Sequence, residues 1–138
     1  GTFSLRNLNF ENIVFLATGT GIAPVKAMLE KLADAPEQLI GKRIYVYWGG
    51  RPVADFYWRP DFACLPLEFV PVMSRADTTW SGRRGYVQQA MLEDKPDLKR
   101  SVVYACGSGA MIQSAREELV VSGLPSKNFY SDAFVSSN

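Results

Sequence analysis

Residues 13–25 read IVFLATGTGIAPV, an apolar run that passes through two glycines into a second apolar segment. The five apolar residues at 13–17 predict a strand buried on both faces, as in a parallel sheet covered by helices. Gly19 and Gly21 allow a tight turn and the close approach of another molecule, and Pro24 suits the first turn of a helix. A helix that follows a glycine-rich turn presents unpaired amide groups and a positive dipole end, so we expect phosphate binding there.

The alternation of strand and helix continues along the chain. Further strands are predicted at residues 43–48, 67–73 and 101–106 and from residue 129 onward, a short helix from residue 55, a helix at residues 87–92, and a last helix spaced by Ile112, Ala115 and Leu119 and ended by Gly123. Five strands that alternate with helices predict an α/β fold, an open doubly wound parallel sheet with helices on both faces.

Ligands of such sheets bind at the carboxyl ends of the strands. Four segments that follow predicted strands should therefore meet at one edge, although they are far apart in the sequence. They are residues 18–22, 49–51, 74–75 and 106–109. Their convergence is better evidence for a binding site than any single motif.

Composition excludes several functional classes. The 138 residues suit one domain, and a formal charge of +1 with interspersed signs provides no field for nucleic acid or an anionic membrane. The longest apolar run is far below the roughly 20 residues of a membrane helix, so we expect a cytoplasmic location. Histidine is absent, and Cys64 and Cys106 are too few for a zinc or iron–sulfur set, so no metal site is expected. If the protein is an enzyme, a cofactor supplies the chemistry.

The glycine motif departs from the common dinucleotide fingerprint. It has only the first two glycines, and no acidic residue ends the second predicted strand. Five motifs in one order instead resemble the pyridine-nucleotide domain of the ferredoxin–NADP reductase superfamily, over nearly the whole chain. These are TGTGIAP at 18–24, YWGGR at 47–51, GYV at 85–87, YACGS at 104–108 and FYSDAF at 129–134. The ending at 130–135 is similar to reductases of CDP-deoxysugar synthesis.

The resemblance implies a larger parent protein. In this family a flavin domain precedes the nucleotide domain and ends in a Gly-x-Phe-x-Leu pattern, which residues 1–5 match. Residues 1–12 are therefore expected to be the end of an upstream flavin domain and its linker, and residues 13–138 the NAD(P)-binding domain. The flavin motif and the four-cysteine loop are missing, so FAD and a 2Fe-2S cluster are expected elsewhere in the parent, with an electron-accepting enzyme downstream. The fragment alone should bind a nicotinamide nucleotide and transfer nothing.

The first group of implied site residues is the family's pyrophosphate loop. It comprises Thr18, Gly19, Thr20 and Gly21. The alternative is a strand–helix turn without a ligand. We expect Gly21→Val to block nucleotide binding by contact with the pyrophosphate and to leave the fold standing.

The second group matches the cysteine–glycine pair that seats the nicotinamide against the flavin. Cys106 and Gly107 form this pair, and Ser108 follows them in the motif. Hydride transfer requires two flat rings in near contact, so small residues are needed there. The resemblance implies a catalytic role for Cys106 and cofactor contacts for all three, and the alternative is a buried structural cysteine.

The third group occupies the family's place for the adenosine end of the cofactor. Ser74 and Arg75 resemble the pair that holds a 2′-phosphate, and Tyr86 the residue that stacks on adenine. Arg83 and Arg84 are candidates to replace a loop lysine that is not evident. NADH-using members carry similar residues, so the choice between NADH and NADPH stays open, with a lean to NADH, and a solvated basic loop is the alternative.

Two further residues have two interpretations each. Arg51 contacts the nucleotide or only orders its loop, and Phe134 packs on the flavin ring or fills the core. The function implied is that of the NAD(P)H-binding half of a flavin and iron–sulfur reductase, which takes hydride from the nicotinamide to FAD and passes electrons on. A nucleotide-sensing module without catalysis and a reductase of free flavin remain as alternatives.

Overall fold

The computed structural model describes residues 9–50, 59, 61–73 and 82–133. The strands are β1 (Asn12–Thr18), β2 (Arg43–Gly50), β3 (Leu67–Met73), β4 (Arg83–Arg84), β5 (Ser101–Gly107) and β6 (Phe129–Ala133). The α-helices are α1 (Ile22–Ala33), α2 (Val87–Glu93) and α3 (Gly109–Val121). Short 3-10 helices are η1 (Gly19–Gly21), η2 (Pro36–Leu39), η4 (Leu98–Arg100) and η5 (Ser126–Asn128).

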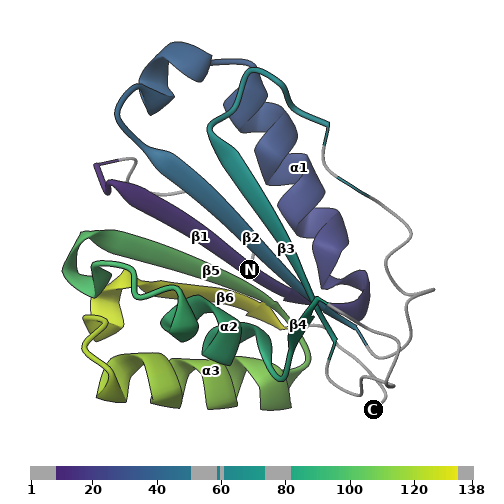
Figure 1. Ribbon diagram of the computed structural model, residues 1–138, viewed down its shortest axis with the longest axis vertical. Coiled ribbons are helices and arrows are strands. Elements are labelled where there is room, and N and C mark those ends of the chain that lie inside the picture. Colours follow the sequence, from purple (N-terminus) through teal and green to yellow (C-terminus); the bar gives the residue numbers. More distant parts are fainter. Residues whose placement is uncertain (1–8, 51–58, 60, 74–81, 134–138) are drawn as a thin grey trace.

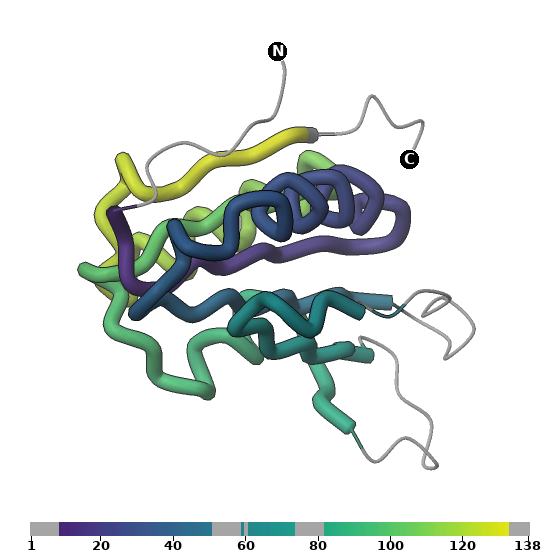
Figure 2. Tube along the Cα trace, turned by 90° about the horizontal axis from the view of Figure 1, so that it is seen from above, coloured from purple at the N-terminus to yellow at the C-terminus, as the bar shows by residue number. Residues whose placement is uncertain are grey.

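The strands form one open sheet in the order β4-β3-β2-β1-β5-β6, and all of their pairings are parallel (Figure 1). The predicted α/β sheet is confirmed, with six strands in place of five. The additional strand is β4, which pairs only with Val72 and Met73 in a stretch predicted to be loop. Figure 2 shows β6 in yellow at one border of the sheet and β4 beside β3 at the other.

Apolar residues cover both faces of the central strands. The continuous apolar run of β1 sends alternate side chains to the two sides, so each face has its own core. The α1 stripe packs on one face, and α2 and α3 pack on the other, as predicted (Figure 1). The buried helix residues are Ile22, Val25, Met28, Leu29 and Leu32 on the first face and Val87, Ala90, Met91, Ala115 and Leu119 on the second.

The predicted end of the last helix agrees with the structure, because Gly123 follows α3 with a φ of +121°. Helix α1 ends at Ala33, shortly before Pro36. Across the described ranges, no helix is long and apolar enough to cross a membrane. The helix predicted from residue 55 lies outside the described residues.

Candidate functional site

The carboxyl ends of the strands meet at one edge of the sheet, where the register aligns Thr18 of β1 with Gly49 of β2 and Ala17 with Cys106 of β5. Strands β2 and β3 lie on one side of β1, and β5 and β6 lie on the other, so the strand order reverses between β1 and β5. Such a reversal is where ligands bind in open α/β sheets. Of the four predicted segments, the structure brings together residues 18–22, 49–50 and 106–109.

The turn after β1 is exposed to solvent on one side and is held by a hydrogen bond from the sheet on the other. Gly19 has a φ of +54°, and a Cβ built on it meets no atom within 4 Å. Its carbonyl accepts a hydrogen bond of 2.9 Å from the indole Nε1 of Trp48, a fully buried side chain of β2. Gly19 and Thr20 are exposed, so their backbone is accessible to a ligand. Sequence reasoning missed Trp48, although a buried indole N–H usually needs a partner.

Gly21 serves packing. It is buried at the end of η1, where its Cα faces the carbonyl group of Cys106 in β5. A Cβ there would overlap the Cys106 carbonyl oxygen and would lie 2.7 Å from the carbonyl carbon and 3.3 Å from the Gly107 nitrogen. Backbone atoms cannot turn away as a flexible side chain can. The expectation that Gly21→Val leaves the fold standing stays a prediction, and these contacts lead us to expect a destabilised variant instead.

Two more glycines make room for the side chain of Thr18. A Cβ on Gly49 would lie 3.3 Å from the Thr18 methyl and 3.0 Å from Val87. A Cβ on Gly107 would overlap the Thr18 hydroxyl and lie 2.7 Å from Met111 Cε. Gly107 is thus small because protein atoms occupy the space beside it, and a ligand can meet only its backbone. Sequence reasoning did not select Gly49 by itself.

Ser108 begins α3 at the same edge. Its Oγ accepts a hydrogen bond of 3.2 Å from the Met111 N–H, so the hydroxyl caps the helix. The hydroxyl hydrogen remains a donor for a ligand. Gly109 and Ala110 are exposed, so the start of α3 faces the site together with the turn after β1.

Cys106 lies inside the core on the α1 side of the sheet and is fully buried. Burial, and then the negative charge of Asp132, raise the pKa of the Cys106 thiol to about 12. The thiol is therefore neutral near pH 7 and is not an activated nucleophile. Any contribution of Cys106 to a nicotinamide site comes from its shape and its backbone position.

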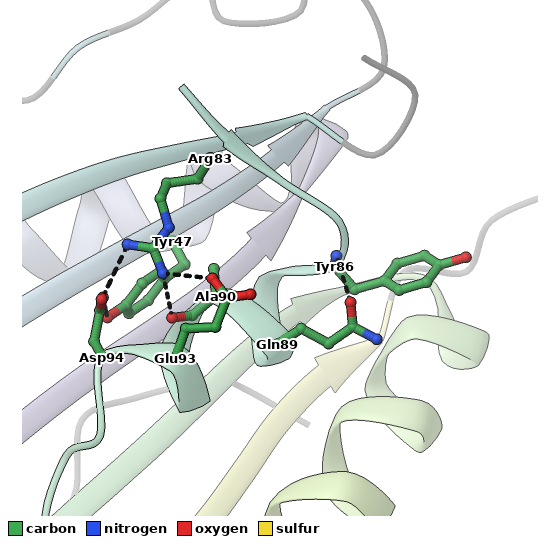
Figure 3. A network of polar contacts seen from close by, with 7 residues as sticks. All are labelled: Tyr47, Arg83, Tyr86, Gln89, Ala90, Glu93 and Asp94. Carbon is green, nitrogen blue, oxygen red and sulfur yellow. Dashed lines mark hydrogen bonds and ion pairs between the residues drawn. The ribbon is translucent and has the colours of Figure 1, made fainter. Parts of the chain in front are cut away.

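Tyr86 stands at the start of α2, and 61% of the residue is exposed. The preceding Gly85 has a φ of +99°, and the Tyr86 N–H donates a hydrogen bond of 3.3 Å to Gln89 Oε1 (Figure 3). The backbone of Tyr86 is held while its aromatic face remains accessible. This arrangement suits the stacking role that the resemblance implies.

Arg83 is paired with acceptors at the carboxyl end of α2. Its guanidinium reaches the far end of α2, with distances of 3.0 Å to Asp94 Oδ1, 3.1 Å to Glu93 Oε1 and 2.7 Å to the Ala90 carbonyl oxygen (Figure 3). These contacts occupy the guanidinium within the chain, and its assignment as a substitute for the loop lysine stays a prediction. Arg84 is exposed in the same strand, and its assignment stays a prediction.

The carboxylate of Asp94 also binds the sheet. Tyr47, a buried residue of β2, donates a hydrogen bond of 2.6 Å from its hydroxyl to Asp94 Oδ2. Burial and this carboxylate raise the pKa of Tyr47. Burial alone would lower the pKa of Arg83, but Asp94 and Glu93 raise it. This network could not be predicted from the sequence, because its members come from three elements.

Four predicted site residues lie outside the described residues. They are Arg51, Ser74, Arg75 and Phe134. Within the part of the chain that the structure describes, no three histidine, cysteine, aspartate or glutamate side chains gather as metal ligands.

The sequence matches the family of oxidoreductase NAD-binding domains over residues 15–117. The CDP-6-deoxy-L-threo-D-glycero-4-hexulose-3-dehydrase reductase of Yersinia pestis is 45% identical over 146 aligned positions, which cover 99% of this chain and 42% of that protein. Protein RfbI of Salmonella typhimurium is 38% identical, with 100% of this chain and 42% of that protein covered. The chain thus spans less than half the length of these relatives.

Several solved structures have the same fold. The CS-b5R domains of human Ncb5or in the NAD+ form match with a TM-score of 0.75 and 21% identity, over 95% of this chain and 39% of that one. A ferredoxin NADP+ reductase from Neisseria gonorrhoeae with bound FAD and NADP matches with a TM-score of 0.70 and 18% identity, over 91% and 56%. The resemblance to the ferredoxin–NADP reductase superfamily is confirmed, and this chain belongs to the family of oxidoreductase NAD-binding domains.

Proposed function

We propose that this domain binds NADH or NADPH across the β1–β5 edge and holds the nicotinamide for hydride transfer to a flavin elsewhere in the same protein. The observation that carries the proposal is the turn at Gly19. Its backbone is open to solvent, fixed by Trp48 and placed at the point where the strand order reverses.

Five described residues of the site have a defined part in this proposal. Gly19 and Thr20 present backbone to the pyrophosphate, and the start of α1 stabilises its charge. Tyr86 offers an exposed ring to the adenine, and Cys106 with Ser108 borders the nicotinamide. A bound nicotinamide would supply a hydride, which is two electrons and a proton, to the flavin. The assignments of Arg51, Ser74, Arg75 and Phe134 remain part of the proposal.

For the parent protein we propose an electron-transfer reductase of CDP-deoxysugar synthesis. Its support is the 45% identity to the Yersinia pestis dehydrase reductase over 99% of this chain. Residues 1–12 then continue from a flavin domain, FAD and a 2Fe-2S cluster lie outside residues 13–138, and a downstream dehydrase accepts the electrons. The cytoplasmic location stays a prediction.

A second candidate is reduction of free flavin. A probable flavin reductase of Aliivibrio fischeri is 28% identical over 97% of this chain and 58% of that protein. The purified parent protein distinguishes the two, because tightly held FAD makes it yellow and a flavin substrate leaves it colourless. A sensing module without catalysis would leave flavin oxidised when NADH is added without oxygen.

A matched pair of glycine variants tests the proposed site in the parent protein. Gly19 and Gly41 both have positive φ values, +54° and +80°, and open space at the Cβ position, but Gly41 lies before β2 at the opposite edge. Both alanine variants carry a similar backbone strain. Calorimetry with ADP-ribose should show a loss of about tenfold for Gly19→Ala and no change for Gly41→Ala. Equal affinities in both variants would move the pyrophosphate site away from this turn.

The same titrations locate the nicotinamide. ADP-ribose should account for most of the affinity for NADH, because most of the contacts proposed here are with its adenosine and pyrophosphate parts. If the nicotinamide supplied most of the affinity, the placement beside Cys106 would be wrong.

A further inference from the structure

Arg83 precedes α2 in the sequence, but its side chain contacts the last turn of that helix. It belongs to β4, which precedes the helix, yet its guanidinium binds the last turn through the Ala90 carbonyl, Glu93 and Asp94. The distances are 2.7 Å, 3.1 Å and 3.0 Å respectively. We call Arg83 with these three acceptors the Arg83 clamp.

The clamp acts on a helix that cannot be stable alone. Helix α2 has 7 residues, and a helix of two turns is not stable in water without tertiary contacts. Arg83 satisfies a carbonyl of the last turn and places positive charge at the negative end of the dipole. Asp94 is held from the other side by the buried Tyr47 hydroxyl at 2.6 Å. The clamp therefore ties the end of α2 both to β4 and to the sheet interior.

The opposite end of α2 carries the exposed Tyr86 ring. The Gly85 N–H donates a hydrogen bond of 3.0 Å to the Met73 carbonyl, and the Tyr86 N–H binds Gln89 Oε1 at 3.3 Å. Figure 3 shows Arg83 and Tyr86 at opposite ends of the helix. The turn between β4 and α2 is thus held by β3 on one side and by its bonds to α2 on the other.

We propose that Arg83 is a positioning residue for the adenosine end of the nucleotide site, which it serves by holding β4 and α2 together and so fixing Tyr86 between them. The inference rests on the proposed function. A positioning residue and a phosphate ligand have different effects on nucleotide binding. A positioning residue affects ligands with and without a 2′-phosphate equally, and its effect disappears when the Tyr86 ring is removed.

A double-mutant cycle in the parent protein tests whether Arg83 acts through Tyr86 or as a phosphate ligand. Calorimetry measures 5′-AMP and 2′-phospho-AMP binding to wild type, Arg83→Gln, Tyr86→Ala and the double variant. Arg83→Gln should weaken both ligands by about fivefold, and by less than twofold in the Tyr86→Ala background. Amide hydrogen exchange without ligand should quicken in residues 85–93 of Arg83→Gln.

Arg100→Gln is the matched control, because Arg100 is a surface arginine that pairs with Glu11 and Asp97 at the other edge of the sheet. It should leave both affinities unchanged. If Arg83→Gln fails to fold, Asp94→Asn weakens the same clamp with its shape kept and should give the same pattern with a smaller loss.

The outcomes of these measurements distinguish a failure of the positioning role of Arg83 from a failure of the proposed function. A loss confined to 2′-phospho-AMP would make Arg83 a phosphate ligand, and full additivity with Tyr86→Ala would show that it does not act through that ring. Either result overturns the inference, as does unchanged binding in Arg83→Gln. A wild type that binds neither nucleotide overturns the proposed function itself.

Discussion

At the scale of single residues, the glycines of the binding edge have two different purposes. Gly19 is open above its Cα, whereas Gly21 and Gly107 leave no space for a Cβ. The sequence predicts glycines that free the backbone, because the motif follows a strand and precedes a helix. It cannot distinguish a ligand-facing glycine from a packed one, since the atoms that face Gly21 belong to Cys106, 85 residues away in a different strand.

Gly21→Ala should therefore destabilise the protein even in the absence of nucleotide. One added methyl group meets the Cys106 carbonyl, and overpacking of this kind costs about 1–3 kcal/mol. Urea unfolding measures the free energy of unfolding. Gly109→Ala is the control, because Gly109 opens α3 with nothing within 4 Å of its Cβ position, and it should be neutral or slightly stabilising. Equal stabilities of the two variants would contradict the packing role.

At the scale of elements, the strands and helices with long hydrophobic patterns are the ones that the sequence predicts. Strands β1 and β5 are continuous apolar runs, and α1 has a long apolar stripe, so their positions are readable from the sequence. Strand β4 has two arginines and no strand pattern, and it forms because it can pair with the end of β3. The Arg83 clamp could not be predicted from the sequence either, because the contact of Arg83 with the last turn depends on the length of α2.

The amino ends of the strands are joined by a buried polar cluster around Ser101. The Ser101 hydroxyl donates to the Asp97 carbonyl at 2.8 Å and accepts from Asn12 Nδ2 at 3.2 Å, and Asn128 Nδ2 donates to the Ser101 carbonyl at 3.2 Å. These contacts connect β1, β5 and η5 at the edge opposite the nucleotide site.

Ser101→Ala should lower the free energy of unfolding by about 1–3 kcal/mol, because Asn12 then loses a buried acceptor. Thermal and urea unfolding check the stability, and ADP-ribose titration should show unchanged affinity below the unfolding transition. Ser126→Ala, at an exposed serine of η5, is the control and should change the stability by under about 0.5 kcal/mol. A Ser101 variant as stable as this control would show that the cluster does not contribute.

At the scale of the whole molecule, the two edges of the sheet differ. The amino edge is closed by polar contacts within the chain, and the carboxyl edge is lined by glycines, helix starts and the Tyr86 ring. The strand–helix alternation predicts which edge binds ligand. It does not reveal how the proposed site is completed, because the chain spans 42% of the length of the Yersinia pestis and Salmonella typhimurium relatives and the proposed hydride transfer requires a second cofactor.

The stability of the whole molecule should fall in alkaline solution through two buried groups. The pKa of the Cys106 thiol is raised from 9.0 to about 12, and that of Tyr47 is raised above its ordinary 10.0, in both cases by burial first. In the unfolded chain these groups lose their protons near their ordinary values, while the native state keeps them. Their contribution is therefore fully present below about pH 9 and is lost progressively as the pH rises above it.

Urea unfolding at pH 8 and at pH 10 measures this loss, and Cys106→Ala isolates the thiol. The variant has no ionisable group at this position, so its stability should fall less between the two pH values than that of wild type. Cys64→Ala is the matched control for the removal of a thiol, because Cys64 is exposed. If Cys106→Ala kept the full alkaline loss, the pKa of the Cys106 thiol would not be raised in the native core, and its role as a neutral, buried group at the proposed nicotinamide site would have to be reconsidered.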